Sequence, residues 1–249
     1  MSHHYIEFKD VHYSYPSGVE ALKGVSFRIG HGEKVALLGR NGAGKSTLLL
    51  QTNGLLMPAS GTVDIGGVKV TRKTLPIVRQ SVGMVFQNPD DQLFMPTVEE
   101  DVAFGPLNMR LPPEDVEKRV EEALRMVGCE DLRRRQPSRL SGGQRRRVAI
   151  ATVLSMYPSV LVLDEPTSNL DWGAREQLIE ILEGFGHTCL VATHDLDLIR
   201  RLCPRTIVID DGRILADTLT ERVFADSELL GIIGIPADAA EAHACDTKI

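Results

Sequence analysis

The residues with the clearest chemical potential lie in the glycine-rich stretch GRNGAGKST, from Gly39 to Thr47. The apolar run EKVALLG before it predicts a buried strand, and GKSTLLLQTNGLL after it predicts a helix. Glycines in this setting let backbone N–H groups turn inward around phosphate oxygens, and the following helix N-terminus favours the same negative charge. This context favours a phosphate-binding loop over a chance glycine-rich turn.

The polar side chains of this loop have separate predicted roles. Lys45 should reach the β- and γ-phosphates of a nucleotide, while the Ser46 hydroxyl should bind Mg²⁺. Thr47 should add a hydrogen bond to the phosphates, and Arg40 is expected to be solvated. The predicted phosphate contacts are Gly39, Asn41, Gly42, Ala43, Gly44, Lys45, Ser46 and Thr47.

Three further polar residues follow apolar runs that predict buried strands. Asp164 ends the run VLVLD, where its carboxylate can complete a Mg²⁺ shell, and the adjacent Glu165 can orient or deprotonate an attacking water. His194 follows TCLVAT, and we expect it to reach the γ-phosphate because phosphate sites gather at the carboxyl ends of strands. An Asp-Glu pair or a lone histidine is usually solvated or structural. The functional prediction for these three residues therefore rests on their positions at the ends of apolar runs.

The elements that must position these residues are strands around a helical middle. Apolar residues from Pro112 to Val127 recur at helical spacing, whereas the flanking segments are short apolar strands. The pattern predicts an α/β core, residues 1–230, with an inserted helical lobe at about residues 88–156. Residues 231–249 are predicted to be an alanine-rich tail with a frayed end.

Composition excludes several other classes of protein. The 249 residues carry a net charge of −6, which argues against a nucleic-acid partner. No run approaches the ~18 apolar residues of a membrane helix, and the N-terminus lacks the apolar segment of an export signal. The four cysteines are scattered, which argues against a disulfide or zinc framework.

The stretch LSGGQRRRVAIA, from Leu140 to Ala151, completes an ordered set of motifs. With it, the chain resembles the nucleotide-binding domain of ATP-binding cassette (ABC) transporters over nearly its whole length. The resemblance implies a P-loop NTPase (RecA-like) core with an antiparallel β subdomain and an inserted α-helical signature subdomain. It also implies that Gln87 senses the γ-phosphate and Mg²⁺, and that Tyr15 stacks on adenine unless it is an ordinary cross-strand tyrosine.

The signature has a physical logic of its own. Its first residues open a helix, so their N–H groups form an anion site that bare glycines allow a phosphate to approach. The resemblance implies that this site closes over ATP bound to a second subunit, an identical copy or a paralogue, and that Asp171 of the SNLD segment helps to link the two sites. The predicted signature contacts are Ser141, Gly142, Gly143 and Gln144. The runs Arg133–Arg135 and Arg145–Arg147 are expected to be solvated or interface charges.

The resemblance then assigns the reaction to particular residues. It implies ATP hydrolysis with Mg²⁺ and a head-to-tail dimer in which both sites are complete. The predicted catalytic residues are Lys45, Gln87, Glu165 and His194, and the predicted Mg²⁺ ligands are Ser46, Gln87 and Asp164.

The stretch QNPDDQLFMPTVEEDVAFGP, residues 87–106, is similar to that of the ATPases of energy-coupling factor (ECF) importers. The short chain and YSYPSGVEALKGVSF are most like cobalt or nickel uptake ATPases; a biotin or other vitamin importer is the alternative. A non-transport ABC ATPase is less favoured, because only ~95 residues separate Lys45 from Ser141 and no sustained heptads occur between them.

The resemblance implies separate membrane subunits and a peripheral place on the cytoplasmic face of a prokaryotic membrane. The predicted contacts with these subunits are Asp90, Asp91, Gln92, Leu93 and Phe94. The acids would pair with basic residues, and Leu93 and Phe94 would supply apolar anchorage. The alternative is a solvated loop with Phe94 tucked into the helical lobe.

Overall fold

The computed structural model describes residues 5–236, which form two sheets that both contact helix α1 (Lys45–Thr52). The smaller sheet is antiparallel, with strand order β2-β1-β4-β5. Its strands are β1 (Ile6–Ser14), β2 (Glu20–Ile29), β4 (Ser60–Ile65) and β5 (Val68–Lys69). Helix α1 ends earlier than the sequence predicted, because Gly54 follows it in a left-handed conformation (φ 67°).

The larger sheet has the order β10-β9-β3-β8-β7-β6 and is parallel except for β10 at its edge. Its strands are β3 (Lys34–Leu38), β6 (Val82–Val85), β7 (Val160–Asp164), β8 (Thr188–Ala192), β9 (Arg205–Asp210) and β10 (Arg213–Leu219). Every residue of β6, β7 and β8 is buried, as expected for parallel strands covered on both faces. The predicted α/β fold with an antiparallel sheet is confirmed.

Strand β3 shows how the sheet divides the core. Val35 and Leu37 belong to the apolar cluster that contains α1 and the antiparallel sheet. Ala36 and Leu38 belong to the cluster on the other face, which contains apolar residues of the helical middle and of the C-terminal helices. Because successive side chains of a strand point to opposite faces, this single strand joins both halves of the core.

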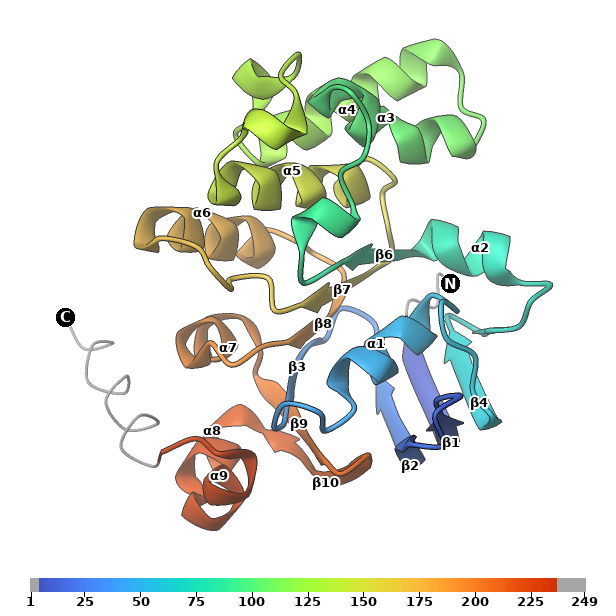
Figure 1. The fold of residues 1–249 in the computed structure, drawn as a ribbon, viewed down its shortest axis with the longest axis vertical. Coiled ribbons are helices and arrows are strands. Elements are labelled where there is room, and N and C mark those ends of the chain that lie inside the picture. Colours follow the sequence, from blue (N-terminus) through green and yellow to red (C-terminus); the bar gives the residue numbers. More distant parts are fainter. Residues whose placement is uncertain (1–4, 237–249) are drawn as a thin grey trace.

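The helical middle lies beyond the β6 edge of the sheet, at the top of Figure 1. It contains α3 (Val98–Asn108), α4 (Pro113–Met126) and α5 (Gly142–Leu154). Helix α4 buries Val116, Val120, Ala123 and Leu124, which confirms the helical face predicted there. Short helix α2 (Leu75–Ser81) leads into β6.

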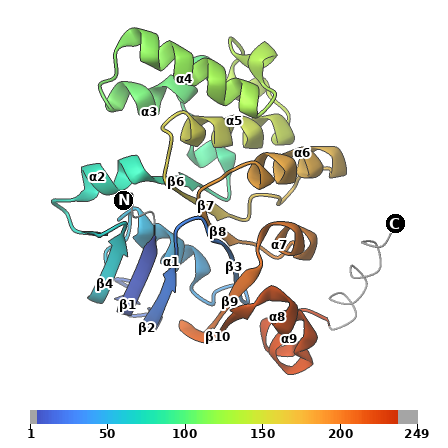
Figure 2. The ribbon, with the colours of Figure 1, turned by 180° about the vertical axis from the view of Figure 1, so that it is seen from behind.

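The C-terminal helices cover the sheet and its other end, as Figure 2 shows from behind. They are α6 (Trp172–Glu183), α7 (Leu196–Leu202), α8 (Thr220–Ala225) and α9 (Ser227–Ile233). The predicted tail thus begins inside α9, where Ile233 is buried, and its residues 237–249 lie outside the described part of the chain. No helix within residues 5–236 is both long and apolar enough to cross a membrane.

Candidate active site

Sheet order brings the predicted functional segments to one edge. Strands β3, β8, β7 and β6 are successive neighbours, and each is followed by one of these segments. Because parallel strands end at the same edge, the segments meet there around a cleft of about 680 Å³. The predicted residues that line it are Tyr15, Asn41, Gly42, Gly44, Lys45, Ser46, Thr47, Gln87, Asp164, Glu165 and His194.

Two glycines of the phosphate-binding loop cannot be replaced without moving the backbone. A Cβ atom at Gly39 would lie 2.2 Å from the Ile209 carbonyl oxygen. One at Gly44, whose φ is +106°, would lie 2.6 Å from the Ala21 carbonyl oxygen. At these two positions the loop packs on β9 and on the start of β2 with no room for a side chain, and this contact fixes its shape.

Lys45 begins α1 and is folded back over the loop. Its Nζ donates to the Gly39 carbonyl at 2.7 Å and to the Arg40 carbonyl at 3.1 Å. Burial lowers the pKa of Lys45, and the carboxylates of Glu165 and Asp164 oppose that shift. The ammonium group thus sits between the loop and two acids, where it can face a phosphate.

The Mg²⁺ prediction fits the donors present in the cleft. Asp164 is buried at the end of β7 and accepts a hydrogen bond from the Ser46 hydroxyl. Burial raises the pKa of Asp164, while Ser46, Lys45 and Arg146 pull it down. These oxygens, with the Gln87 amide, are hard donors of the kind that Mg²⁺ prefers. No group of three His, Cys, Asp or Glu residues that could hold a metal occurs within residues 5–236.

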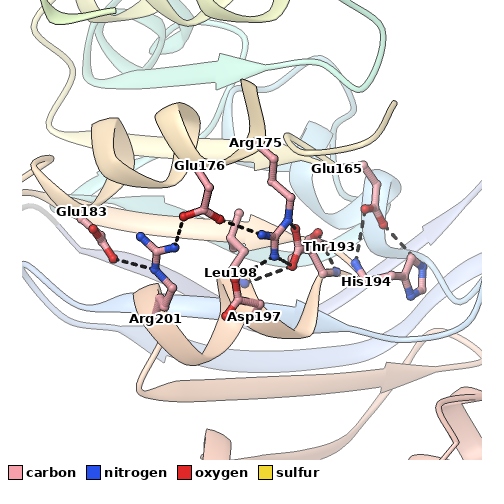
Figure 3. A network of polar contacts seen from close by, with 10 residues as sticks. Glu165, Arg175, Glu176, Glu183, Thr193, His194, Asp197, Leu198 and Arg201 are labelled. Atoms are coloured by element: carbon pink, nitrogen blue, oxygen red, sulfur yellow. Dashed lines mark hydrogen bonds and ion pairs between the residues drawn. The ribbon is translucent and has the colours of Figure 1, made fainter. Parts of the chain in front are cut away.

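Glu165 and His194 face each other at the cleft, as Figure 3 shows. The Glu165 carboxylate accepts from the His194 backbone N–H at 3.3 Å, and its other oxygen lies 3.4 Å from His194 Nε2. Glu165 has a left-handed backbone (φ 45°), a strained conformation for a side-chain-bearing residue that turns it away from the β7 direction. Burial lowers the pKa of His194, and the nearby Glu165 carboxylate opposes that shift. The His194 Nε2 lies 3.3 Å from Lys45 Nζ.

Tyr15 lies at the rim of the same cleft. Its hydroxyl is 2.8 Å from Thr47 Oγ1, and the side chain is 37% exposed. Tyr15 follows the end of β1, so it is not part of a cross-strand pair, and its ring packs edge-on against that of Tyr13 with centroids 5.1 Å apart.

The signature residues stand apart from this cleft. Ser141 and Gln144 cap α5 reciprocally, with Gln144 N–H donating to Ser141 Oγ at 3.2 Å and Ser141 N–H donating to Gln144 Oε1 at 3.0 Å. A Cβ at Gly142 would meet nothing within 4 Å, whereas one at Gly143 would lie 2.8 Å from Ala174 Cβ. Within residues 5–236, Gly142 lines a second cleft of about 290 Å³ and no signature residue lines the first.

Arg146 is a site residue that sequence reasoning missed. It was predicted to be solvated or at an interface, but it is 2% exposed. Its guanidinium donates to the Phe86 carbonyl at 2.7 Å and to the Gln87 carbonyl at 2.6 Å, so the signature helix holds the Gln87 segment in place. The spacing of Arg146 from the buried Ala149, Ile150 and Val153 is that of one helix face and could have revealed this.

The prediction for the loop after Gln87 is also wrong in part. Asp90 and Asp91 are exposed and Phe94 is 63% exposed, but Leu93 is buried at 9% in the core of the helical lobe. Gln92 donates from Nε2 to the Ala149 carbonyl at 2.7 Å. Gln92 therefore attaches the loop to α5, and the buried Leu93 cannot supply the predicted apolar anchorage.

Leu93 is buried because the loop turns sharply. Asn88 caps a short 3₁₀ turn at Pro89–Asp91, and Asp101 Oδ1 accepts from the N–H groups of Phe94 and Met95 at 3.0 Å. The exposed apolar side chain beside Phe94 is Phe104 of α3 and not Leu93. The two phenyl rings pack edge-on, with ring centroids 4.9 Å apart. Asp171 likewise has a local role, because its side chain caps α6 by accepting from Ala174 N–H at 2.8 Å.

Comparison with known proteins identifies relatives along most of the chain. The ABC transporter family matches residues 22–168. A putative ABC transporter ATP-binding protein of Geobacter sulfurreducens is 59% identical over 230 residues, which span 92% of each chain. The energy-coupling factor transporter ATP-binding protein EcfA of Methanocaldococcus jannaschii is 50% identical over 230 residues, which span 90% of this chain and 82% of EcfA.

Solved structures agree with these relatives. The fold matches CbiO1 from Clostridium perfringens, part of the ABC transporter complex CbiONQ, with a TM-score of 0.80 and 38% identity over 96% of this chain and 98% of that chain. It also matches the dimeric ATP-binding cassette MJ0796 bound to ADP and Pi, with a TM-score of 0.78 and 33% identity over 86% of this chain and 98% of that one. The chain therefore belongs to the ATP-binding proteins of ABC transporters, and it is an ATPase of the energy-coupling factor type.

Proposed function

We propose that this chain hydrolyses Mg²⁺-ATP to drive import through separate membrane subunits. The observation that carries the proposal is the meeting of Lys45, Glu165 and His194 at one cleft, on loops that follow three different strands. Lys45 Nζ faces the two acids and the loop carbonyls, a position from which it can stabilise charge on a γ-phosphate. In this proposal Tyr15 stacks on the adenine.

The hydrolytic step follows from the same geometry. Glu165 orients a water for in-line attack on the γ-phosphate and accepts its proton, while His194 holds the carboxylate through its backbone N–H. Ser46, Gln87 and Asp164 would hold Mg²⁺, which would neutralise phosphate charge. The His194 ring can donate to a phosphate oxygen through a protonated ring nitrogen.

We place two ATPase subunits head to tail in the working protein. The separation of the signature from the phosphate cleft supports this arrangement, because an exposed helix N-terminus with open space at Gly142 suits an anion held by another chain. The dimer of the related cassette MJ0796, solved with ADP and Pi, supports it further. The second subunit is an identical copy or a paralogue.

The membrane subunits would dock on what we term the lobe surface: Asp90, Asp91, Phe94, Phe104 and Leu107. The three apolar side chains are exposed, and the acids beside them suit basic residues of a cytoplasmic helix. This docking would place the protein at the cytoplasmic face of a prokaryotic membrane.

Reversing the charges of the lobe surface tests this docking. Asp90→Lys with Asp91→Lys should reduce co-purification of the membrane subunits at least about tenfold, because like charges would then face each other. ATP binding should stay within about twofold of wild type. The matched control is Glu221→Lys with Glu228→Lys, exposed acids on α8 and α9 at the opposite end of the molecule in Figure 1. Undiminished co-purification of the Asp90 and Asp91 variant would contradict the docking.

For the cargo we propose a cobalt or nickel ion, on the similarity of residues 87–106 and of the N-terminal segment to uptake ATPases for these metals. The cargo does not touch this subunit, so the test is uptake by the assembled transporter. Cells expressing the chain with its membrane subunits should accumulate labelled cobalt or nickel, and cells with the Glu165→Gln chain should not. Accumulation of labelled biotin instead would favour the vitamin importer.

A further inference from the structure

A polar network runs from the active site into helices α6 and α7 (Figure 3), and Arg175 is its centre. Arg175 Nε donates to Asp195 Oδ2 at 2.7 Å and Nη2 donates to Asp195 Oδ1 at 2.5 Å. Nη2 also reaches Asp197 Oδ2 at 2.9 Å. The Arg175 side chain is only 14% exposed, so this fork is a fixed and partly desolvated contact rather than a loose surface pair.

The acid held by this fork sets the backbone at His194. Asp195 follows His194 directly, caps α7 by accepting from Leu198 N–H at 3.1 Å, and donates its own N–H to Thr193 Oγ1 at 3.1 Å. Burial alone would raise the pKa of Asp195, but the Arg175 fork and the Leu198 N–H hold it below its ordinary value. An ionised Asp195 clamped on both oxygens therefore fixes the residue that precedes it.

The other side of α6 touches the signature helix. A side chain at Gly143 would collide with Ala174, the neighbour of Arg175, so the first turns of α5 and α6 are in close contact. Asp171 caps this same turn of α6. Two contacts therefore connect the signature helix to His194. The first joins Gly143 to Ala174, and the second joins Arg175 to Asp195.

We propose that Arg175 is a positioning residue that couples the signature helix to the His194–Glu165 pair. A shift of α5 when its N-terminus meets an anion would displace Ala174, and the bidentate fork would pass this shift to Asp195 and His194. A partner's ATP at the signature would in this way align the histidine that serves the chain's own ATP. The inference rests on the proposed hydrolysis in a head-to-tail dimer.

Arg175→Lys tests the inference, because lysine keeps the charge but cannot form the planar two-point contact. We expect kcat for ATP to fall about tenfold or more, since a small displacement of His194 misaligns the attacking group. The KM for ATP should stay within about twofold, because the phosphate-binding loop is untouched.

Arg201→Lys is the matched control. Arg201 joins the same two helices through Glu176 at 2.7 Å and Glu183 at 3.1 Å, farther from the active site (Figure 3). It should lower the Tm as much as Arg175→Lys does and leave kcat within about twofold. Equal losses of kcat in both variants, or none in Arg175→Lys, would overturn the inference.

Tryptophan emission supplies a readout beyond activity. Trp172 is the only tryptophan of the chain, and the Arg175 guanidinium lies 5.2 Å from its ring centroid. ATP should change the Trp172 emission of the Glu165→Gln chain, and adding Arg175→Lys should abolish that change. An unaltered response would overturn the inference, whereas a wild-type chain that cannot hydrolyse ATP would overturn the proposed function itself.

Discussion

Replacing Glu165 with glutamine should reduce ATP turnover by about a hundredfold or more. Glutamine has the same shape, and its carbonyl oxygen can still accept from the His194 N–H, which lies 3.3 Å from a Glu165 oxygen. It cannot take a proton from the attacking water, so the chemical step fails while ATP binding survives. Phosphate release at saturating ATP and direct nucleotide binding measure the two properties separately.

The same variant should accumulate as an ATP-bound dimer. In the proposed head-to-tail dimer, ATP closes the pair and hydrolysis opens it, so blocking hydrolysis should trap the closed form, which size-exclusion chromatography detects. Glu183→Gln is the control, because Glu183 pairs with Arg201 away from the cleft. If Glu165→Gln released phosphate at the wild-type rate, Glu165 would not be the base.

Lys45→Ala should weaken ATP binding and reduce ATP turnover, each by about a hundredfold or more. Among the described residues, Lys45 is the only lysine or arginine that lines the cleft, whose lining also includes Glu20, Asp164, Glu165 and Asp211. Without its ammonium group, the carboxylates that line the cleft would repel the phosphates of ATP. A fluorescent ATP analogue measures the affinity, and phosphate release measures the turnover.

Arg40→Ala is the matched control for this experiment. Arg40 lies in the same loop, but its side chain is exposed and does not line the cleft within residues 5–236. Its loss should change affinity by less than about twofold. An Arg40→Ala chain as weak as Lys45→Ala would show that the loop binds phosphate by diffuse charge rather than through Lys45.

The site elements that sequence predicts are those encoded locally. The phosphate-binding loop and Asp164 each follow an uninterrupted apolar run, and a buried parallel strand is both the cause of that run and the reason why its end lies at the cleft. Gln87 and His194 follow runs of the same kind. The same short apolar run therefore predicts both a buried parallel strand and the place of a site residue at its end.

No local sequence pattern predicts the long-range contacts that support the site. Arg146 meets carbonyls about sixty residues away in the chain, and Arg175 meets Asp195 across two helices. An arginine whose partner is a backbone carbonyl leaves no complementary residue in the sequence. Leu93 was misplaced for a related reason, since its burial depends on a turn that Asp101 stabilises from the next helix.

The separation of Gly142 from the phosphate cleft has a genetic consequence. In the proposed head-to-tail pair, when both subunits are copies of this chain, each catalytic centre takes its phosphate loop from one chain and its signature from the other. Consider a chain damaged at Lys45 that is mixed with a chain damaged at Ser141, each inactive alone. Their mixed pair has one centre that carries both lesions and one that carries neither. The two alleles would therefore complement each other, and the gene would behave as two cistrons within a single reading frame.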